Sequence, residues 1–597
     1  MIRLCLMFVP LILVPVAPTR AGFADVLGRK NDYLIRWADQ WRDSGYQMEP
    51  DAREWKWDEF DPTWCGAIAA MRLKRSDAEV AKANEYLAKM SEGGSMRAAE
   101  AIHTLYLFKE DPQLSEAARR RLWHLTVETP APKRIYDSVW RYHTTENIVT
   151  MTHTWFLLSA QLKGDSAGLA EMEDHLCEFI DAHFQMGWVE FYSPCYMEKV
   201  AGSLMMLTQW ADSPRVRRKA RALLDLMFAE YAIHNFGQVM AAPCMRAYGY
   251  NPIPADAELG HNSHRDFSRS GIYSMGYVLF GSGSMVDYGV LGTPVLVTCD
   301  YVPPELVLDL GTSERERFVF RASKPGLNVS RYGLTPKVPK PPYSARVYCW
   351  HTPEFVLAGT QEVNYVHSAL RYNPVNSILF FHGDPRKLIY TELTLEHGRE
   401  NFGISVDLVQ HRGVQIGKGA AGMAYFAKDL FEELVEDGGW IFVRDGATFA
   451  AYRVVDGGYS WRQAGGASVH GDYIDYANKK SEFVLHVCPS KNYAEDFQDF
   501  QRDMQDNEVA KTKSGIRYTV TGEDGFSLDL SPGMPAASVE AGGDYTVCRG
   551  RPPRLNGEEI DLEGYAGIDC PFLFQERNGR YAEIRFRGEQ LTIGVGP

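Results

Sequence analysis

From about residue 31 to residue 280, hydrophobic positions recur roughly every three to four residues, the spacing of an amphipathic helix. The stretch SPRVRRKARALLDLMFAEYAIHNFG (213–237) is typical. It begins with Ser213 as N-cap and Pro214 in the first helical position, and Gly237 follows its end. Its apolar stripe is formed by Val216, Ala220, Leu223, Met227 and Tyr231. Similar stretches joined by short polar segments predict about eight or nine helices in antiparallel hairpins.

After residues 301–304 (YVPP) the hydrophobic period changes to two. The segments SARVYCW (344–350), EFVLAGTQEV (354–363), WIFVRDGATFAAYRVV (440–455) and EFVLHVC (482–488) read as strands separated by Gly, Asp and Asn. Many such strands predict stacked antiparallel sheets. The sequence therefore predicts a multidomain α-then-β protein, with a helical domain at 22–300 and an antiparallel β region at 301–597.

The N-terminal stretch MIRLCLMFVPLILVPVAPTRAG combines a basic residue, an apolar run and a small residue at the expected cleavage position. This pattern is typical of a secretory signal peptide, here residues 1–21, and predicts export to the periplasm or the extracellular space. The alternative is a membrane anchor, which the short, Pro-containing run disfavours. We expect no membrane span in the mature chain.

The composition excludes several classes of protein. A hydrophobic content of 45% argues against disorder, and a net charge of −14 without a basic tract argues against a nucleic-acid partner. The ten cysteines are dispersed without a CxxC pair. GxSxG, HExxH and GxxxxGK[ST] motifs are absent, and so is GxGxxG after a strand. We expect no metal and no cofactor, and the oligomeric state is not predicted.

Three stretches of the helical half carry candidate chemistry, and the first is RYHTTENIVTMTH (141–153). Thr144 or Thr145 caps a helix, and Asn147 falls in its first turn, where its amide can bind a carboxylate or a hydroxyl. The alternative is simple capping with a solvated face. His153, in mid-helix, is more often a core histidine. The entrance to this helix is rich in aromatic groups: Trp140, Tyr142 and His143.

The second stretch is WVEFYSPCYME (188–198). Ser193 and Pro194 predict a helix start, which places Tyr196 in the first turn, on a stripe with Val200 and Leu204. Its phenol then projects from the end of the core. The alternative is a tyrosine that anchors the helix end through its hydroxyl.

The third stretch combines NFGQVMAAPCMRAYGYNP (235–252) with GHNSHRDFSRSG (260–271). Loops on a rigid scaffold are where binding groups gather. Two histidines three residues apart can bind a metal, but no third ligand is signalled, so an anion-binding or titrating role is favoured. The polar and aromatic groups of this joint include Arg246, Tyr248, Tyr250, His261, His264 and Arg265.

The layout resembles the polysaccharide lyases of the chondroitin AC lyase, heparinase II/III and oligoalginate lyase type. TENIVTMTHTWFLLSAQ (145–161) looks like the stretch around the substrate-carboxylate Asn of those enzymes. WVEFYSPCYMEKVAGSLMMLTQWAD (188–212) and AAPCMRAYG (241–249) are similar to segments of their uncharacterised bacterial relatives. The resemblance implies an (α/α) toroid followed by β-sandwich domains. Ile148 stands where many such lyases have a histidine, so a catalytic histidine has to come from elsewhere, with His143, His261 and His264 as candidates.

The resemblance also implies an exported lyase that cleaves a uronic-acid-containing polysaccharide or oligosaccharide by β-elimination. Asn147 and Arg246 would hold the uronate carboxylate, Tyr196 or a histidine would take the proton, and Tyr196 or Tyr248 would return one. Substrate-binding candidates are Trp140, Tyr142, Tyr192, Tyr250, Arg265 and Arg371. Further possible contributors from the β half, each more often structural, are His351, His367, Arg371, Tyr372 and His382.

Two other functions remain open from the sequence. A glycoside hydrolase on the same scaffold would need two carboxylates, for which Glu146 and Glu190 are the candidates. Their simpler roles are helix N-terminal charge for Glu146 and a surface loop for Glu190. A non-catalytic glycan-binding protein would use the aromatic side chains for stacking on sugar rings.

Overall fold

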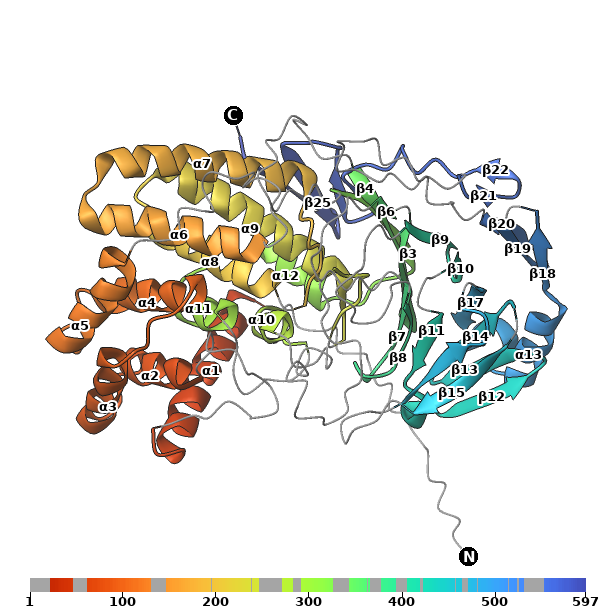
Figure 1. The fold of residues 1–597 in the computed structure, drawn as a ribbon, viewed down its shortest axis with the longest axis horizontal. Helices are drawn as coiled ribbons and strands as arrows, with labels where there is room; N and C mark the ends of the chain where they lie inside the picture. The colour runs from red at the N-terminus through yellow and green to blue at the C-terminus, as the bar shows by residue number, and fades with distance from the viewer. Residues whose placement is uncertain are drawn as a thin grey trace, which may run out of the picture.

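The structure is a computed structural model of the chain. It describes residues 22–46, 62–129, 146–194, 196–237, 239–245, 271–282, 291–325, 343–361, 363–364, 377–392, 405–418, 422–456, 458–463, 471–479, 481–513, 515–522, 525–530 and 552–596. Helices form one side of the molecule and sheets the other (Figure 1). The predicted order, α then β, is confirmed.

The helices of the N-terminal half pack both against their neighbours in sequence and against the next helix but one. They are α1 (Phe23–Asp43), α2 (Pro62–Arg72), α3 (Asp77–Ala88), α4 (Ser95–Phe108), α5 (Glu116–Trp123), α6 (Glu146–Lys163), α7 (Ser166–Met186), α8 (Met197–Trp210), α9 (Pro214–His234), α10 (Gly271–Phe280), α11 (Gly292–Thr298) and α12 (Glu305–Thr312). Helix α9 begins as predicted, since Ser213 Oγ accepts a hydrogen bond from Val216 N and Pro214 occupies the first turn. Its predicted apolar stripe is buried.

The helical array closes on itself, because α1 packs against α10 and α11. Arg29 donates to the carbonyl oxygens of Val278 (2.8 Å) and Leu279 (3.0 Å) at the end of α10. The buried Lys30 ammonium donates to the carbonyl oxygens of Cys299 and Tyr301, both at 2.8 Å, just after α11. The first helix thus satisfies carbonyl groups at the ends of late helices, which have no intrahelical donor.

Between α9 and α10 lies a small hairpin of β1 (Asn235–Phe236) and β2 (Val239–Met240), with Gly237 in the left-handed region (φ 66°) at its turn. The period change that the sequence places after residue 304 lies one helix later. Helix α12 precedes the first strand of the β half, which starts at Phe318.

The β half contains three antiparallel sheets among the described residues. The largest has twelve strands: β15 (Tyr459–Gln463), β16 (Asp472–Tyr476), β11 (Met423–Phe426), β8 (Leu388–Glu392), β7 (Ser377–Phe381), β5 (Phe355–Gln361), β4 (Tyr343–His351), β3 (Phe318–Pro325), β23 (Ile568–Cys570), β24 (Leu573–Gln575), β25 (Tyr581–Phe586) and β26 (Glu589–Gly594). The second has seven: β12 (Glu433–Asp437), β13 (Trp440–Asp445), β14 (Thr448–Val454), β17 (Glu482–Pro489), β10 (Val414–Lys418), β9 (Ser405–His411) and β6 (Val363–Asn364).

The third sheet has five strands: β18 (Glu508–Thr512), β19 (Gly515–Val520), β20 (Phe526–Leu530), β21 (Arg554–Leu555) and β22 (Glu558–Glu559). Helix α13 (Phe497–Asp506), which the sequence reading did not predict, covers the seven-stranded sheet beside it. On β13, Ile441 and Val443 join the main core, while Trp440 and Phe442 face a second core shared with α13 and the five-stranded sheet. Alternate residues of β13 therefore point to opposite faces of the sheet, and both faces are buried, each in a different core.

Polar contacts join the helical half to the twelve-stranded sheet. Gln575 Nε2 donates to Phe184 O (2.7 Å), and Arg580 pairs with Asp181 (2.9 Å). Strand β26 packs against α9 and α12, and β25 packs against α12. The end of α7 is thereby held against the β half, close to the segment that carries the candidate site.

Within the described part of the chain, no helix has both the length and the apolar character needed to cross a bilayer. The described cysteines are free thiols, and all but Cys570 are buried. The predicted signal peptide lies outside the described residues.

Candidate active site

The first turn of α6 is tied to the connection between α7 and α8 by the carboxylate of Glu146. Its Oε1 accepts hydrogen bonds from Val189 N (2.9 Å) and from His183 Nε2 (3.0 Å), and its Oε2 accepts one from Glu190 N (2.9 Å). The side chain is 2% exposed. This one carboxylate therefore holds Asn147, the next residue of α6, beside the segment that leads to Tyr196.

His183 supports this anchor from the last turn of α7. Its Nδ1 donates to Phe179 O (2.9 Å), because a carbonyl oxygen only accepts, and its Nε2 faces Glu146. Both ring nitrogens are therefore engaged by protein groups. Trp188 packs on the ring at a centroid distance of 4.2 Å. The pair is thus a buried, hydrogen-bonded unit shielded from water.

The segment after α7 turns sharply before α8 begins. Tyr192 adopts a left-handed backbone (φ 52°), and Ser193 Oγ accepts a hydrogen bond from Tyr196 N (3.3 Å). Helix α8 starts only at Met197, with Tyr196 as its N-cap residue. The prediction that Ser193 caps the helix itself is wrong, because its hydroxyl caps a turn that precedes α8. Tyr196 therefore stands at the helix entrance and not inside the first turn.

The third candidate stretch reaches the same segment through its backbone. Met245 N donates to Phe191 O at 3.1 Å. Met245 is the last described residue before Arg246, so the chain enters the Arg246 stretch from a position in contact with the 187–196 segment. The hairpin that leads there is fixed at its base, where Ala241 N donates to His234 O (2.8 Å).

The start of α8 gathers charged groups that the core encloses. Glu190, Glu198 and Lys199 are each 3% exposed or less, and Asn147 is equally buried. Lys199 Nζ lies 4.7 Å from the centroid of the Tyr196 ring, and Tyr196 itself is partly exposed. A partly exposed phenol beside a buried ammonium is an arrangement suited to proton transfer, because the cation stabilises a phenolate.

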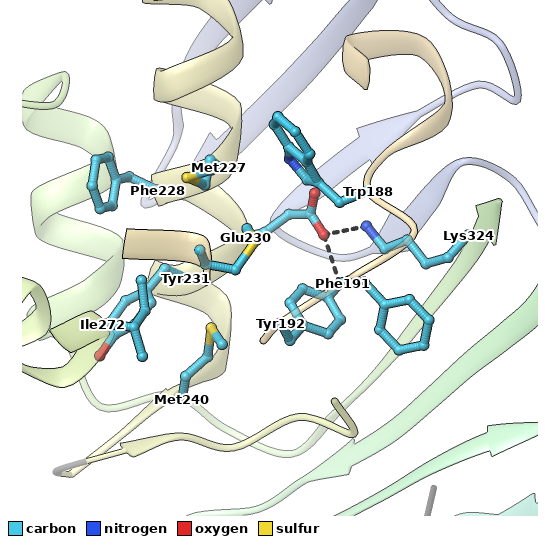
Figure 2. Close-up of a pocket in the computed structure, with 11 residues that line it drawn as sticks. Trp188, Phe191, Tyr192, Met227, Phe228, Glu230, Tyr231, Met240, Ile272 and Lys324 are labelled. Carbon is cyan, nitrogen blue, oxygen red and sulfur yellow. Dashed lines mark hydrogen bonds and ion pairs between the residues drawn. The ribbon is translucent and has the colours of Figure 1, made fainter. Parts of the chain in front are cut away.

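Tyr192 belongs to a buried triad behind this entrance (Figure 2). Its hydroxyl donates to Glu230 Oε2 (2.6 Å), and Lys324 Nζ from β3 pairs with the same oxygen at 2.5 Å. Burial, followed by the charge of Glu230, raises the pKa of the Tyr192 phenol well above its usual range. The adjoining cavity is about 10 Å³, room for about one water molecule. Tyr192, proposed from the sequence as a substrate contact, occupies an interior position here.

Many of the sequence candidates lie outside the described residues: Trp140, Tyr142, His143, Arg246, Tyr248, Tyr250, His261, His264, Arg265, His367, Arg371 and Tyr372. Among the others, His153 lies in the core, as expected, and burial lowers its pKa to about 3. His382 contacts the ring of Phe236. His351 lies at the interface of the two halves, 3.2 Å from His234.

Sequence reasoning did not single out Lys199, His183, Glu230 or Lys324. For Lys199 a signal was available, since it follows Tyr196 by three residues on a predicted helix and so shares its face. The Glu230–Lys324 pair joins α9 to β3, and no local pattern in the sequence indicates such a long-range contact.

Comparisons with known proteins give similarity at the level of structure only. The search of protein-family models and the search of curated proteins found no match. Among solved structures, the chain is similar to a chondroitin AC lyase of Streptomyces coelicolor A3 in complex with chondroitin sulphate, with 12% identity, 85% of each chain covered and a TM-score of 0.40. It is also similar to a chondroitinase AC lyase studied as oligosaccharide complexes, with 10% identity, 96% of this chain and 98% of that chain covered, and a TM-score of 0.40. Such values give no residue-to-residue correspondence.

Proposed function

We propose that this chain is a carbohydrate-active enzyme, a lyase that cleaves a uronic-acid-containing polysaccharide by β-elimination. The observation that carries the proposal is the meeting of three distant segments. Glu146 bonds the backbone of Val189 and Glu190 to the turn that holds Asn147, and Phe191 accepts a hydrogen bond from Met245, the neighbour of Arg246. The segments that carry Asn147 and Tyr196 and the segment that leads to Arg246 are therefore joined to one another by these hydrogen bonds.

The chemistry needs these groups in defined roles. The C5 proton of a uronate is weakly acidic, so the C6 carboxylate has to be neutralised by preorganised donors while charge develops. In the proposal Asn147 and Arg246 supply these donors. Tyr196 takes the C5 proton as a phenolate, the C5–H electron pair becomes the C4–C5 double bond, and the C4–O bond breaks. The departing oxygen receives a proton from Tyr196 or Tyr248.

The hydrolase alternative receives less support from the geometry of Glu146. All three hydrogen bonds that its carboxylate accepts come from protein groups, and the residue is buried. A general acid or base has to come within hydrogen-bond reach of a substrate atom. Glu146 would have to abandon the contacts that hold the segment, so an anchoring role fits it better than catalysis.

The test is a screen of the mature protein against alginate, glucuronan, chondroitin sulphate, heparan sulphate and ulvan. Ultraviolet absorbance reports the conjugated double bond, and a parallel assay reports new reducing ends. We expect both signals with one substrate. Tyr196→Phe should lower the rate by about 10²–10⁴-fold. The matched control is Tyr581→Phe, because that tyrosine is 57% exposed on β25.

Other results would decide against the lyase. Reducing ends without any double bond, lost in Glu190→Gln, would identify a hydrolase. Binding of a glycan without any product, unchanged in Tyr196→Phe, would identify a glycan-binding protein. Near-normal elimination by Tyr196→Phe would remove the phenol from its proposed role.

Export is the second part of the proposal and rests on the pattern of residues 1–21. Expression of the full chain in a bacterium with an active secretion system should yield a protein shortened at its N-terminus in the periplasm or medium. Intact mass and cell fractionation measure this. A full-length product confined to the cytoplasm would contradict it.

A further inference from the structure

A cluster of three metal-binding side chains lies where the helical half meets the twelve-stranded sheet. His234 is the last residue of α9, and Cys349 and His351 lie on β4. One potential ligand atom from each residue lies within 4.8 Å of the other two, and all three residues are buried. His234 Nδ1 and His351 Nε2 are 3.2 Å apart. Two nitrogens bound to one tetrahedral Zn²⁺ at about 2.0–2.1 Å lie roughly 3.3–3.4 Å apart.

The backbone around each ligand is fixed before any ion binds. Arg315 donates to Ala232 O and to Asn235 O, both at 2.8 Å, and so clamps the chain on both sides of His234. Cys349 and His351 are two residues apart on β4, which places both side chains on the same face of the sheet. Strand β4 is paired on both sides, by β3 and β5. A site built on such elements is held more accurately than one on a loop.

A metal at this position would bind the lone pairs of two imidazoles, and the Cys349 thiol would lose its proton when the ion binds. The nearby Lys324 ammonium is paired with Glu230, which offsets its repulsion of a cation.

We propose that His234, Cys349 and His351 form a binding site for a single Zn²⁺ ion that joins the helical half to the β half. Two imidazoles and one thiolate are a donor set that zinc binds readily. No local pattern indicates this site, because His234 lies 117 residues before His351 and only the fold brings it to the Cys349–His351 pair. The proposed zinc site does not depend on the proposed lyase reaction.

The location suggests what the ion does. The ring of His234 packs against Tyr192 of the 187–196 segment at 4.9 Å, and against Phe320 of β3 at 4.4 Å. An ion fixing His234 to β4 would therefore stiffen the contact between the candidate active site and the β half. Three protein ligands leave the fourth position of a tetrahedral ion to a water molecule. Because the ion would join two parts of the fold, its removal should first lower the stability of the protein.

The competing explanation is a plain hydrogen bond between the two imidazoles, with an unrelated thiol nearby. Metal content separates the two. The full chain is treated with a chelator, supplied with excess Zn²⁺, passed through gel filtration and analysed by plasma mass spectrometry. We expect about one zinc per chain, as a single site requires. Retention should fall at least about tenfold in His234→Gln and in Cys349→Ser, as the loss of one ligand implies.

The matched control is Cys488→Ser, which removes another buried thiol from a strand of a different sheet and should keep its zinc. Should the ligand variants fold poorly by circular dichroism, the wild-type chain loaded with Co²⁺ decides the matter. A tetrahedral visible spectrum with thiolate-to-cobalt charge transfer is expected. A wild-type chain that retains no zinc, ligand variants that retain it fully, or a cobalt spectrum without charge transfer would each overturn the proposal.

Discussion

Two connections flank α8, and they differ in length, in burial and in the charged groups packed around them. The connection from α8 to α9 is short, Ala211–Ser213. Ser213 caps the next helix, and Asp212 is exposed. The connection from α7 to α8, Gly187–Tyr196, is long and largely buried, and it is held by two groups of ionic hydrogen bonds, around Glu146 and Glu230. Both connections reverse the chain, but only the second one encloses charge.

The difference indicates which connection was shaped by function. Reversing the chain between two helices needs no more than a cap and a few solvated residues. Burying carboxylates and a lysine around a loop costs free energy unless each is paired, so a loop packed in this way needs another reason to exist. Accurate placement of Asn147 and Tyr196 is such a reason. The following variants test whether the anchors hold this segment in place.

The largest effect is expected from Glu146→Ala. It leaves the His183 ring and two backbone N–H groups without their acceptor in the interior, at a cost of about 5 kcal/mol. Urea unfolding followed by tryptophan fluorescence measures it, since Trp188 sits on the affected ring. The control is Glu116→Ala, whose carboxylate is exposed on α5 and should matter by about 0.5 kcal/mol or less. Equal effects of the two variants would show that Glu146 anchors nothing.

The next effect is that of Lys324→Met, which strips the Glu230 carboxylate of its cation but leaves it the Tyr192 hydroxyl. We expect a loss of about 3 kcal/mol in the free energy of unfolding. The double variant Lys324→Met with Glu230→Met removes both charges and should regain most of this loss. A double variant less stable than the single one would show that the Tyr192–Glu230 hydrogen bond, and not the ion pair, carries most of the stabilisation.

Much of the architecture could be predicted because it depends on residues that are close together in the sequence. The stripe of α9 and its Ser213–Pro214 start follow from residue spacing, and so do the hairpin of β13 and β14 and the alternation along β17. The start of α8 was misplaced, because a Ser-Pro pair caps an isolated turn as readily as a helix.

The candidate site was predictable only in part. Asn147 and Tyr196 stand out because polar and aromatic groups at helix entrances follow a local pattern. The contacts that unite them do not. Glu146 was considered as a catalytic carboxylate or a helix-end charge, and its bonds to Val189 and Glu190 depend on how α6 packs beside α7. The His234–His351 contact likewise spans two domains and leaves no trace in either local sequence.

A smaller effect should follow from Tyr192→Phe, which removes one hydrogen bond to a charged acceptor while keeping the ring. We expect a loss of about 2 kcal/mol. If Tyr192 is an anchor and Tyr196 the reacting phenol, Tyr192→Phe should keep most of the elimination activity that Tyr196→Phe loses. Measuring unfolding and initial rates on both variants separates the roles. An activity loss in Tyr192→Phe as deep as that in Tyr196→Phe would return Tyr192 to the substrate-binding role.

The smallest effect is expected in the short connection between α8 and α9, Ala211–Ser213. Ser213→Ala removes the acceptor for Val216 N at the start of α9, which costs about 1 kcal/mol. Because that end of α9 lies at the opposite end of the helix from Glu230 and His234, catalytic rates should stay unchanged while the unfolding midpoint in urea falls slightly. If Ser213→Ala instead disturbed activity as strongly as Glu146→Ala, the two connections would be equivalent, and burial of charge would not distinguish the one that carries the site.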